Sequence, residues 1–212
     1  PWAVSIIFST PMFGGQCTAE FFQSALDLRG MLVLSGIDHQ WLVTTNESLI
    51  PRARNTAVAR FLFDPELSQY DRFMFIDADI EFKAEDVQKL WNLDVDVATA
   101  AYPMKRPEAG VTAWRDGKLV NLDELSGPTE IDFAGTGFLM IKRSVFERMA
   151  AEYPEAEHTE GSVGRCFAFF NTEVVNDGVG PYFISEDYYF CRNLRKMGGK
   201  IILDPSIRLG HV

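Results

Sequence analysis

The sequence has few cysteines and a deficit of basic residues. The three cysteines, Cys17, Cys166 and Cys191, are odd in number and form no CxxC pair. A disulfide framework is therefore not expected. We expect the protein to work in a reducing, cytoplasmic compartment. Lys and Arg number 20 against 30 Asp and Glu, which gives a formal net charge of -10. We expect no nucleic acid partner, because such proteins need cations to displace the counterions of phosphates.

A long hydrophobic run is also missing. No stretch reaches the roughly 18 apolar residues of a membrane-spanning helix, and no signal peptide is recognisable. We therefore expect no membrane span. Because the sequence begins with Pro1 rather than Met, we also allow for its being one domain of a larger protein.

The apolar residues present are enough for a folded core. Of the 212 residues 47% are hydrophobic, and 17 are Phe, which suits one large or two small domains. Strands are predicted at 3–8, 39–45, 72–76 and 94–102, and helices at 18–35, from Pro51 onward and at 84–92. This alternation indicates an α/β fold with a mostly parallel sheet, in which ligands bind beyond the carboxyl ends of strands.

The pattern changes beyond residue 103. Residues 111–122 are predicted to form a hairpin, and Ser144 with Glu147 predicts a capping box at the start of a helix. Residues 153–184 are rich in Gly and aromatics and are predicted to form an irregular loop over a site. A last helix and strand are predicted at 186–197 and 200–203.

Asp77 and Asp79 follow the apolar strand at 72–76 and are the strongest sign of chemistry. Two carboxylates so close repel each other unless a proton or a cation intervenes. Carboxylate oxygens suit Mg²⁺ or Mn²⁺, so the pair predicts a divalent metal site. The alternative is a solvated turn, in which Asp is common. The buried strand before the pair favours the metal site.

His211 lies at the other end of the chain, after a strand and a glycine. A histidine from a distant segment can complete a carboxylate metal site, and an imidazole ligand favours Mn²⁺ over Mg²⁺. The alternative is an ordinary surface histidine near a terminus. His39 and His158 have no comparable neighbours and are expected to be structural or solvent-facing.

Charged residues mark the starts of two helices. Arg52 and Arg54 lie in a first turn, where a cation opposes the helix dipole. A bound anionic diphosphate, a buried carboxylate or a surface salt bridge would explain them. Glu186 and Asp187 lie in the first turn of the last helix, where acidic residues are normal. Their functional alternative is a general base or a hydroxyl anchor.

The segment Gly135-Thr136-Gly137 lacks the third glycine of a dinucleotide fingerprint and precedes a strand rather than a helix. We therefore expect these small residues to let a ligand approach the backbone closely.

In this order, the segments resemble a glycosyltransferase of the GT-A fold over nearly the whole chain. The resemblance rests on Ser9-Thr10-Pro11, Arg54-Asn55, Phe75-Ile76-Asp77-Ala78-Asp79, Gly135 to Ile141, Ser185-Glu186-Asp187 and Gly210-His211. It implies a central, mostly parallel sheet flanked by helices, with a smaller mixed sheet on the acceptor side. The whole chain, 1–212, would be one domain, with a nucleotide-binding half at 1–102 and a donor-sugar and acceptor half at 103–212.

A narrower resemblance links the chain to the glycosyltransferase domain encoded by large chlorella viruses, which would place it in the host cytoplasm. The implied nucleotide-binding residues are Ser9, Thr10, Pro11, Arg54, Asp77 and Ala78, with Gly135, Thr136 and Gly137 facing the donor sugar. The implied metal ligands are Asp77, Asp79 and His211, and the implied catalytic residues are Asp187 and Glu186.

The activity implied by the resemblance is metal-dependent transfer of a hexose or deoxyhexose from a UDP-sugar to a glycan or glycoprotein acceptor. Inverting members use the Asp at the position of Asp187 as a base, whereas a terminal His ligand is more typical of retaining members. His211 therefore favours retention. A non-catalytic nucleotide- or glycan-binding module of the same fold is the alternative.

Overall fold

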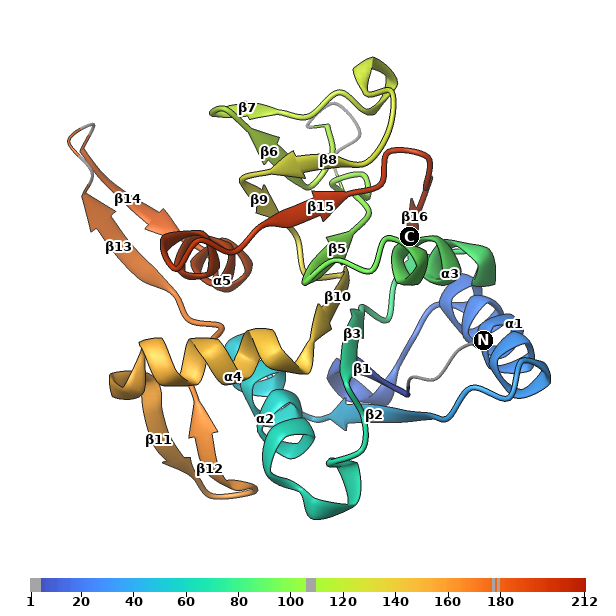
Figure 1. The fold of residues 1–212 in the computed structure, drawn as a ribbon, viewed down its shortest axis with the longest axis horizontal. Coiled ribbons are helices and arrows are strands. Elements are labelled where there is room, and N and C mark those ends of the chain that lie inside the picture. The colour runs from blue at the N-terminus through green and yellow to red at the C-terminus, as the bar shows by residue number, and fades with distance from the viewer. Residues whose placement is uncertain (1–4, 106–109, 177, 179) are drawn as a thin grey trace.

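The computed structural model describes residues 5–105, 110–176, 178 and 180–212 (Figure 1). A seven-stranded sheet crosses the molecule in the order β2-β1-β3-β10-β5-β15-β8. Five strands run in one direction, while β10 and β8 are antiparallel to their neighbours. This confirms the predicted α/β fold with its mostly parallel sheet. In the order given, the strands span His39–Thr45, Ile6–Met12, Arg72–Ile76, Phe138–Lys142, Val97–Thr99, Ile201–Leu203 and Thr129–Ile131.

Five helices cover the two faces of this sheet (Figure 1). One face packs on α1 and α3, and the other on α2, α4 and α5. Alternate residues of β3 serve the two layers: Met74 and Ile76 join the first, Phe73 and Phe75 the second. The helices are α1 (Ala19–Leu34), α2 (Ile50–Phe63), α3 (Ala84–Asn92), α4 (Arg143–Glu152) and α5 (Glu186–Lys196).

Small antiparallel units surround the main sheet. Strands β7, β6 and β9 form a three-stranded sheet, and short pairs join β11 to β12, β13 to β14 and β16 to β4. These strands are β4 (Ile80–Glu81), β6 (Ala113–Arg115), β7 (Lys118–Leu119), β9 (Phe133–Ala134), β11 (Glu157–Glu160), β12 (Gly164–Phe167), β13 (Glu173–Asn176), β14 (Pro181–Ile184) and β16 (Gly210–His211). Short 3-10 turns span Phe13–Gly15, Pro65–Leu67, Leu122–Glu124 and Pro154–Ala156.

Several predicted boundaries agree with the structure, namely 39–45, 72–76 and 84–92. The hairpin turning at Asp116-Gly117 is confirmed as well, with positive φ at both residues. The strand predicted at 94–102 is shorter, because only Val97–Thr99 pairs with its neighbours. Of the strand predicted at 3–8, residues 3 and 4 lie outside the described residues.

Other predictions were wrong for identifiable reasons. The first strand was predicted to end at residue 8, but β1 continues through Ser9, Thr10 and Pro11, because β2 pairs with β1 as far as Met12. Helix α4 begins before Ser144, so the predicted capping box is not formed. Its first residue, Arg143, is fixed by a backbone hydrogen bond to the oxygen of Asp71.

The segment 153–184 was predicted to be irregular, but in its described part it forms two hairpins, β11–β12 and β13–β14. The second hairpin extends away from the body of the molecule (Figure 1). Its strands bury one face so little that no alternation of apolar residues marks them in the sequence.

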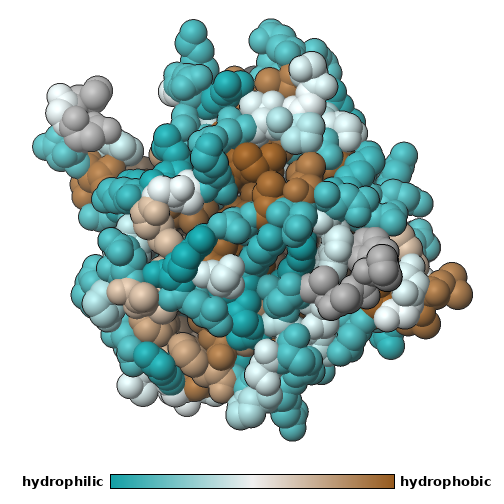
Figure 2. Space-filling view, viewed as in Figure 1, coloured by the Kyte–Doolittle hydropathy of each residue, from teal (hydrophilic) through white to brown (hydrophobic). Residues whose placement is uncertain are grey.

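The surface is mostly hydrophilic on the side seen in Figure 2, with hydrophobic residues at the outer end of α1 and on the β13–β14 hairpin. Leu34 is 91% exposed and Phe183 is 66% exposed. No helix among the described residues is long and apolar enough to cross a membrane.

Asn55 connects the start of α2 to a segment more than a hundred residues away. Its Nδ2 donates to the oxygen of Phe170 at 2.8 Å, and its Oδ1 accepts from the nitrogen of Phe170 at 2.9 Å. The Phe170 ring in turn stacks on Phe190 of α5, with ring centroids 4.8 Å apart. Asn55 is 7% exposed, so these hydrogen bonds are shielded from water.

We predict that Asn55→Ala lowers the free energy of unfolding by about 2–4 kcal/mol, because it leaves two backbone groups of Phe170 buried without partners. Urea unfolding measures the change. The control is Asn92→Ala at the exposed end of α3, which should stay within about 0.5 kcal/mol of the parent. Equal effects at both positions would contradict the connecting role of Asn55.

Candidate functional site

A cavity of about 520 Å³ lies where β1 and β3 end and where α2 and α5 begin. The end of β1 and the turn after it contribute Pro11, Phe13, Gln16, Cys17 and Thr18. The remaining lining comes from the start of α2 (Ile50 and Arg54), the segment after β3 (Asp77, Ala78 and Asp79) and Glu186 at the start of α5. This is the edge at which parallel α/β sheets bind their ligands.

Arg54 and Asp77 form a bidentate ion pair at the base of the cavity. The two terminal guanidinium nitrogens donate to the two oxygens of Asp77 at 3.1 and 3.0 Å. Arg54 is 5% exposed and lies over the ring of Phe75, 5.1 Å from its centroid. Burial lowers the pKa of Arg54, but the charge and hydrogen bonds of Asp77 outweigh it and raise the pKa.

Two separate ion pairs explain the two arginines found at the start of α2. The buried Arg54 neutralises two partly exposed carboxylates, since Glu186 also lies 3.6 Å from its Nε. Arg52 instead forms a surface salt bridge with Glu47 at 2.6 Å. Both oxygens of Asp77 accept hydrogen bonds from Arg54. Asp77 also lines the cavity, and its role as a metal ligand stays a prediction.

Asp79 faces a different set of partners. Its Oδ2 lies 3.4 Å from Nε2 of His211 and 2.8 Å from Nζ of Lys105. The chain end reaches this position because β16 pairs with β4, with His211 opposite Ile80. The structure therefore brings together Asp79 and His211, which are 132 residues apart in the sequence.

The tautomer of His211 is fixed by its second nitrogen. Nδ1 lies 2.6 Å from the oxygen of Pro103, and a carbonyl can only accept, so Nδ1 carries the hydrogen. In a neutral ring, Nε2 then presents a lone pair toward Asp79. Metal-binding histidines are oriented in this way by a carbonyl on the far nitrogen.

A metal would find two ligands here rather than three. Among the described residues, no group of three or more His, Cys, Asp or Glu is arranged to hold a metal ion. Asp79 and His211 offer one carboxylate and one imidazole, a set that suits Mn²⁺. They fit a metal whose other positions are filled by phosphate oxygens and water.

The two acidic residues at the start of α5 differ in their surroundings. Glu186 lines the cavity, whereas Asp187 is not among the lining residues. The Asp187 carboxylate accepts hydrogen bonds from the Ser185 hydroxyl and from the Tyr188 nitrogen, the latter at 2.8 Å. Burial raises the pKa of Asp187 to about 6.

Two glycines predicted to face a ligand are instead explained by a side chain. A Cβ on Gly135 would lie 2.4 Å from Oη of Tyr102, and one on Gly137 would lie 2.7 Å from it. The nitrogen of Gly137 donates to that same oxygen at 3.0 Å. Thr136 between them is 1% exposed. The close approach inferred from the sequence is thus made by Tyr102.

Ser9, Thr10 and Pro11 were predicted to bind the nucleotide. Only Pro11 lines the cavity. Ser9 and Thr10 are fully buried, and Thr10 accepts a hydrogen bond from the Trp41 indole at 2.8 Å. The correction follows from the extension of β1, which carries these residues into the sheet.

The sequence reasoning missed several residues around the cavity. Phe13 is 69% exposed and Ile50 is 38% exposed, and both border its opening. A large aromatic residue directly before Gly14-Gly15, where a buried strand ends, was the available signal for Phe13. Lys105 gave no signal, because only the fold brings it to Asp79.

Solved structures with the same fold are glycosyltransferase domains and a viral protein. A197 from STIV matches 99% of this chain and 86% of its own, with a TM-score of 0.61 and 19% identity. GalNAc-T7, solved with UDP, GalNAc and Mn²⁺, matches 98% of this chain and 44% of its own, with a TM-score of 0.51 and 12% identity.

The catalytic domain of Drosophila β1,4-galactosyltransferase 7, solved with xylobiose, matches 95% of this chain and 65% of its own, with a TM-score of 0.50 and 15% identity. The chain has the GT-A fold. No family model and no curated protein matches the sequence. The narrower resemblance to the chlorella virus domain stays a prediction.

Asp187 gives the site a testable pH dependence. Its folded pKa of about 6 exceeds the ordinary value of 3.8, so the folded chain holds this proton more tightly than the unfolded chain. The contribution of Asp187 to the stability of the parent therefore falls as the pH rises from 4 to 7, by up to about 3 kcal/mol. Asp187→Asn, which still accepts both hydrogen bonds, should not show this loss.

The measurement is urea unfolding of the parent and of Asp187→Asn at pH 4, 5, 6 and 7. The difference between the two proteins should grow with pH in favour of the variant. A difference that stays constant over this range would mean that Asp187 ionises at its ordinary pKa.

Proposed function

We propose that this chain is a metal-dependent glycosyltransferase that moves a hexose or deoxyhexose from a UDP-sugar to a glycan or glycoprotein acceptor, with retention. The observation that carries the proposal is the cavity at the carboxyl edge of a GT-A sheet, where Asp79, His211 and the Arg54–Asp77 pair converge. The cavity draws on both proposed halves, because Asp79 comes from 1–102 and Glu186 comes from 103–212. His211, also from 103–212, contacts Asp79.

The nucleotide would enter between the exposed side chains of Phe13 and Ile50. A base ring can pack against an aromatic face and an aliphatic side chain. Thr18 closes this end, because its nitrogen and hydroxyl both donate to the oxygen of Ala78, at 2.9 and 3.4 Å. Ala78 is thereby fixed between the two acidic residues and gives the ribose a firm surface.

The diphosphate would lie beside Asp79 and His211, with a Mn²⁺ or Mg²⁺ ion between them and the phosphate oxygens. When bound, the ion would neutralise the charge that grows on the leaving nucleoside diphosphate. Lys105, 2.8 Å from Asp79, adds a positive charge near the same oxygens. The chain itself is acidic, with a net charge of -10, so local cations are needed to accept a diphosphate.

Retention is supported by how the acidic residues of α5 are held. Asp187 accepts two hydrogen bonds and does not line the cavity, so it is poorly placed to take a proton from an acceptor. Glu186 lines the cavity but is held 3.6 Å from Arg54. Glu186 suits the anchoring of a sugar hydroxyl, and the leaving phosphate would assist the acceptor.

A non-catalytic nucleotide- or glycan-binding module of the same fold is the second candidate. The favouring observation is that Asp77 is paired with Arg54 and that fewer than three metal ligands gather among the described residues. Slow hydrolysis of UDP-glucose or UDP-galactose by the parent protein would support the enzyme, whereas binding without hydrolysis would support the module.

The central prediction is that Asp79→Ala abolishes metal-dependent UDP binding, because it removes the carboxylate that would hold the ion. Calorimetric titration of UDP, then CDP and GDP, with Mn²⁺ and again with excess chelator, tests it. The parent should bind UDP only with the metal. Asp27→Ala, an exposed position of α1, should bind as the parent does.

Two outcomes would count against this picture. If Asp79→Ala binds UDP and Mn²⁺ like the parent, the site is misplaced. If the parent binds none of the three nucleotides, the transferase proposal fails and the glycan-binding module takes its place.

A second prediction concerns His211 and Lys105, the two neighbours of Asp79. His211→Ala should weaken Mn²⁺ binding without nucleotide by about tenfold or more, with unchanged unfolding, because it removes a ligand. Lys105→Met should instead tighten Mn²⁺ binding about threefold to fivefold, because an exposed ion pair worth up to about 1 kcal/mol no longer competes for Asp79.

The matched control is Lys200→Met, since Lys200 is equally exposed and pairs with Glu130 at 2.9 Å. It should leave the Mn²⁺ titration unchanged. Weaker Mn²⁺ binding by Lys105→Met would show that Lys105 supports the metal site rather than competing for it.

A further inference from the structure

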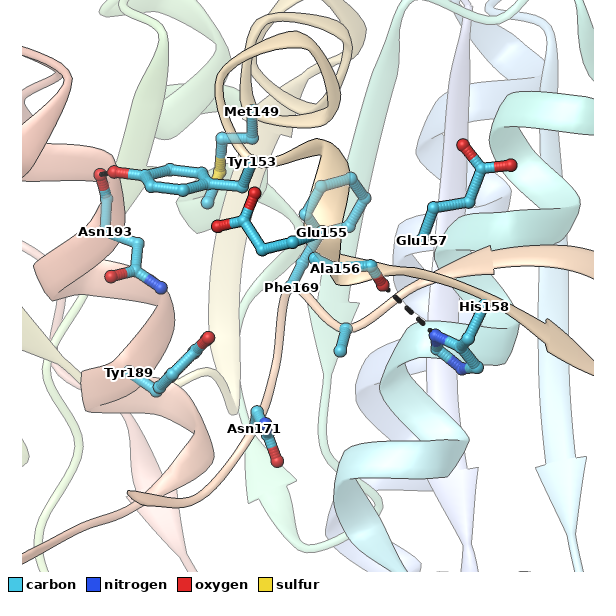
Figure 3. Close-up of a pocket in the computed structure, with 11 residues that line it drawn as sticks. Met149, Tyr153, Glu155, Ala156, Glu157, His158, Phe169, Asn171, Tyr189 and Asn193 are labelled. Atoms are coloured by element: carbon cyan, nitrogen blue, oxygen red, sulfur yellow. Dashed lines mark hydrogen bonds between the residues drawn. The ribbon is translucent and has the colours of Figure 1, made fainter. Parts of the chain in front are cut away.

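A second pocket of about 280 Å³ lies between α4, α5 and the β11–β12 hairpin (Figure 3). Its volume is near the lower end of ligand pockets, which span roughly 300–1,000 Å³. It shares no lining residue with the cavity that holds Asp79. Nothing proposed above uses it.

The side chain of Asn193 is the feature that points to a ligand. Asn193 is 7% exposed, and the hydrogen bonds described for it use its backbone oxygen, which accepts from the Tyr153 hydroxyl at 2.9 Å. Its amide is directed into the pocket (Figure 3). The amide atoms are not among the buried unpartnered polar atoms of the described residues, so solvent reaches them through the pocket. A ligand hydroxyl group, which can both donate and accept, could replace that water beside the amide.

Other polar groups face the same space. Figure 3 shows the Glu155 carboxylate and the Tyr189 hydroxyl directed into the same space as the Asn193 amide, with Asn171 lower in the view. The rings of Tyr153 and Phe169 supply apolar surface. Flat apolar surfaces combined with amide and carboxylate groups match a ligand that has apolar faces and a rim of hydroxyl groups.

The charges of the lining residues narrow the chemical class of the ligand further. Glu155 and Glu157 line the pocket and no Lys or Arg does, so phosphates, nucleotides and other anions are disfavoured. Several polar groups line this small pocket, so a purely apolar ligand is also disfavoured.

We propose that this pocket binds a neutral saccharide unit. The saccharide would be a distal part of the glycan acceptor. This identification of the saccharide as part of the acceptor rests on the proposed function. Binding of the saccharide itself stands on Asn193, Tyr189 and their neighbours.

One helix, α5, connects the pocket to the first cavity. Helix α5 carries Glu186 at one site and Tyr189 and Asn193 at the other, so Glu186 and Asn193 lie roughly 10 Å apart along its axis. Phe169 and Asn171 flank Phe170, whose backbone is held by Asn55, the residue after Arg54. A glycan bound in the second pocket would therefore have a fixed position relative to the donor.

Saturation-transfer NMR on the full chain tests the proposal, with the methyl glycosides of glucose, galactose, mannose and N-acetylglucosamine as probes. At least one glycoside should receive saturation and bind with a millimolar Kd. Tyr189→Ala and Asn171→Ala, both at the accessible rim, should weaken its binding at least fivefold. Asn193→Leu, which keeps the side-chain volume, should do the same if it folds.

The controls separate this proposal from the first. Asn92→Ala removes an exposed amide outside the pocket and should bind the glycoside normally. Asp79→Ala should also bind it normally, whether or not the chain proves to be a glycosyltransferase. The proposal is overturned if no glycoside binds, if the rim variants bind like the parent, or if ethylammonium binds the pocket in place of the glycosides.

Discussion

The pairing of the buried Arg54 with Asp77 is the interaction on which the site depends. It joins the first turn of α2 to the residue after β3, and Glu186 adds the start of α5 to the same guanidinium. Removing the Arg54 charge from water is costly, and the buried guanidinium is maintained only when its ion pairs and hydrogen bonds have good geometry. The planar fork of Arg54 meets this condition, because it matches both carboxylate oxygens at once.

One consequence is that two neighbouring acidic residues acquire different roles. Asp77 is neutralised inside the protein, so the repulsion expected between adjacent carboxylates is already relieved. Asp79, two residues later, is left to face Lys105 and His211. The pairing of β16 with β4 is what delivers His211, and the oxygen of Pro103 sets the orientation of its ring. The proposed metal position thus depends on three separate segments of the chain.

Aromatic packing gives this arrangement a firm base. Phe75 lies beneath Arg54 and meets the ring of Phe170 edge-on at 5.2 Å, and Phe170 stacks on Phe190. Phe190 belongs to α5, the helix that lines both pockets. Edge-to-face and stacked contacts of this kind add to the stability that burial alone provides. The two pockets therefore share one aromatic core and are not expected to move independently.

The sequence by itself determined the α/β fold, the continuous strand at 72–76 and the hairpin at Asp116-Gly117. These features depend on local patterns: runs of apolar residues, turn residues with positive φ, and alternation of strand and helix. Tertiary structure alone decided that Tyr102 fills the space beside Gly135 and Gly137, that Ser9 and Thr10 are buried, and that Lys105 lies at Asp79. The reason is physical. Local propensity fixes the conformation of a segment, but the partner of a charge or of a glycine is set by packing between segments far apart in the chain.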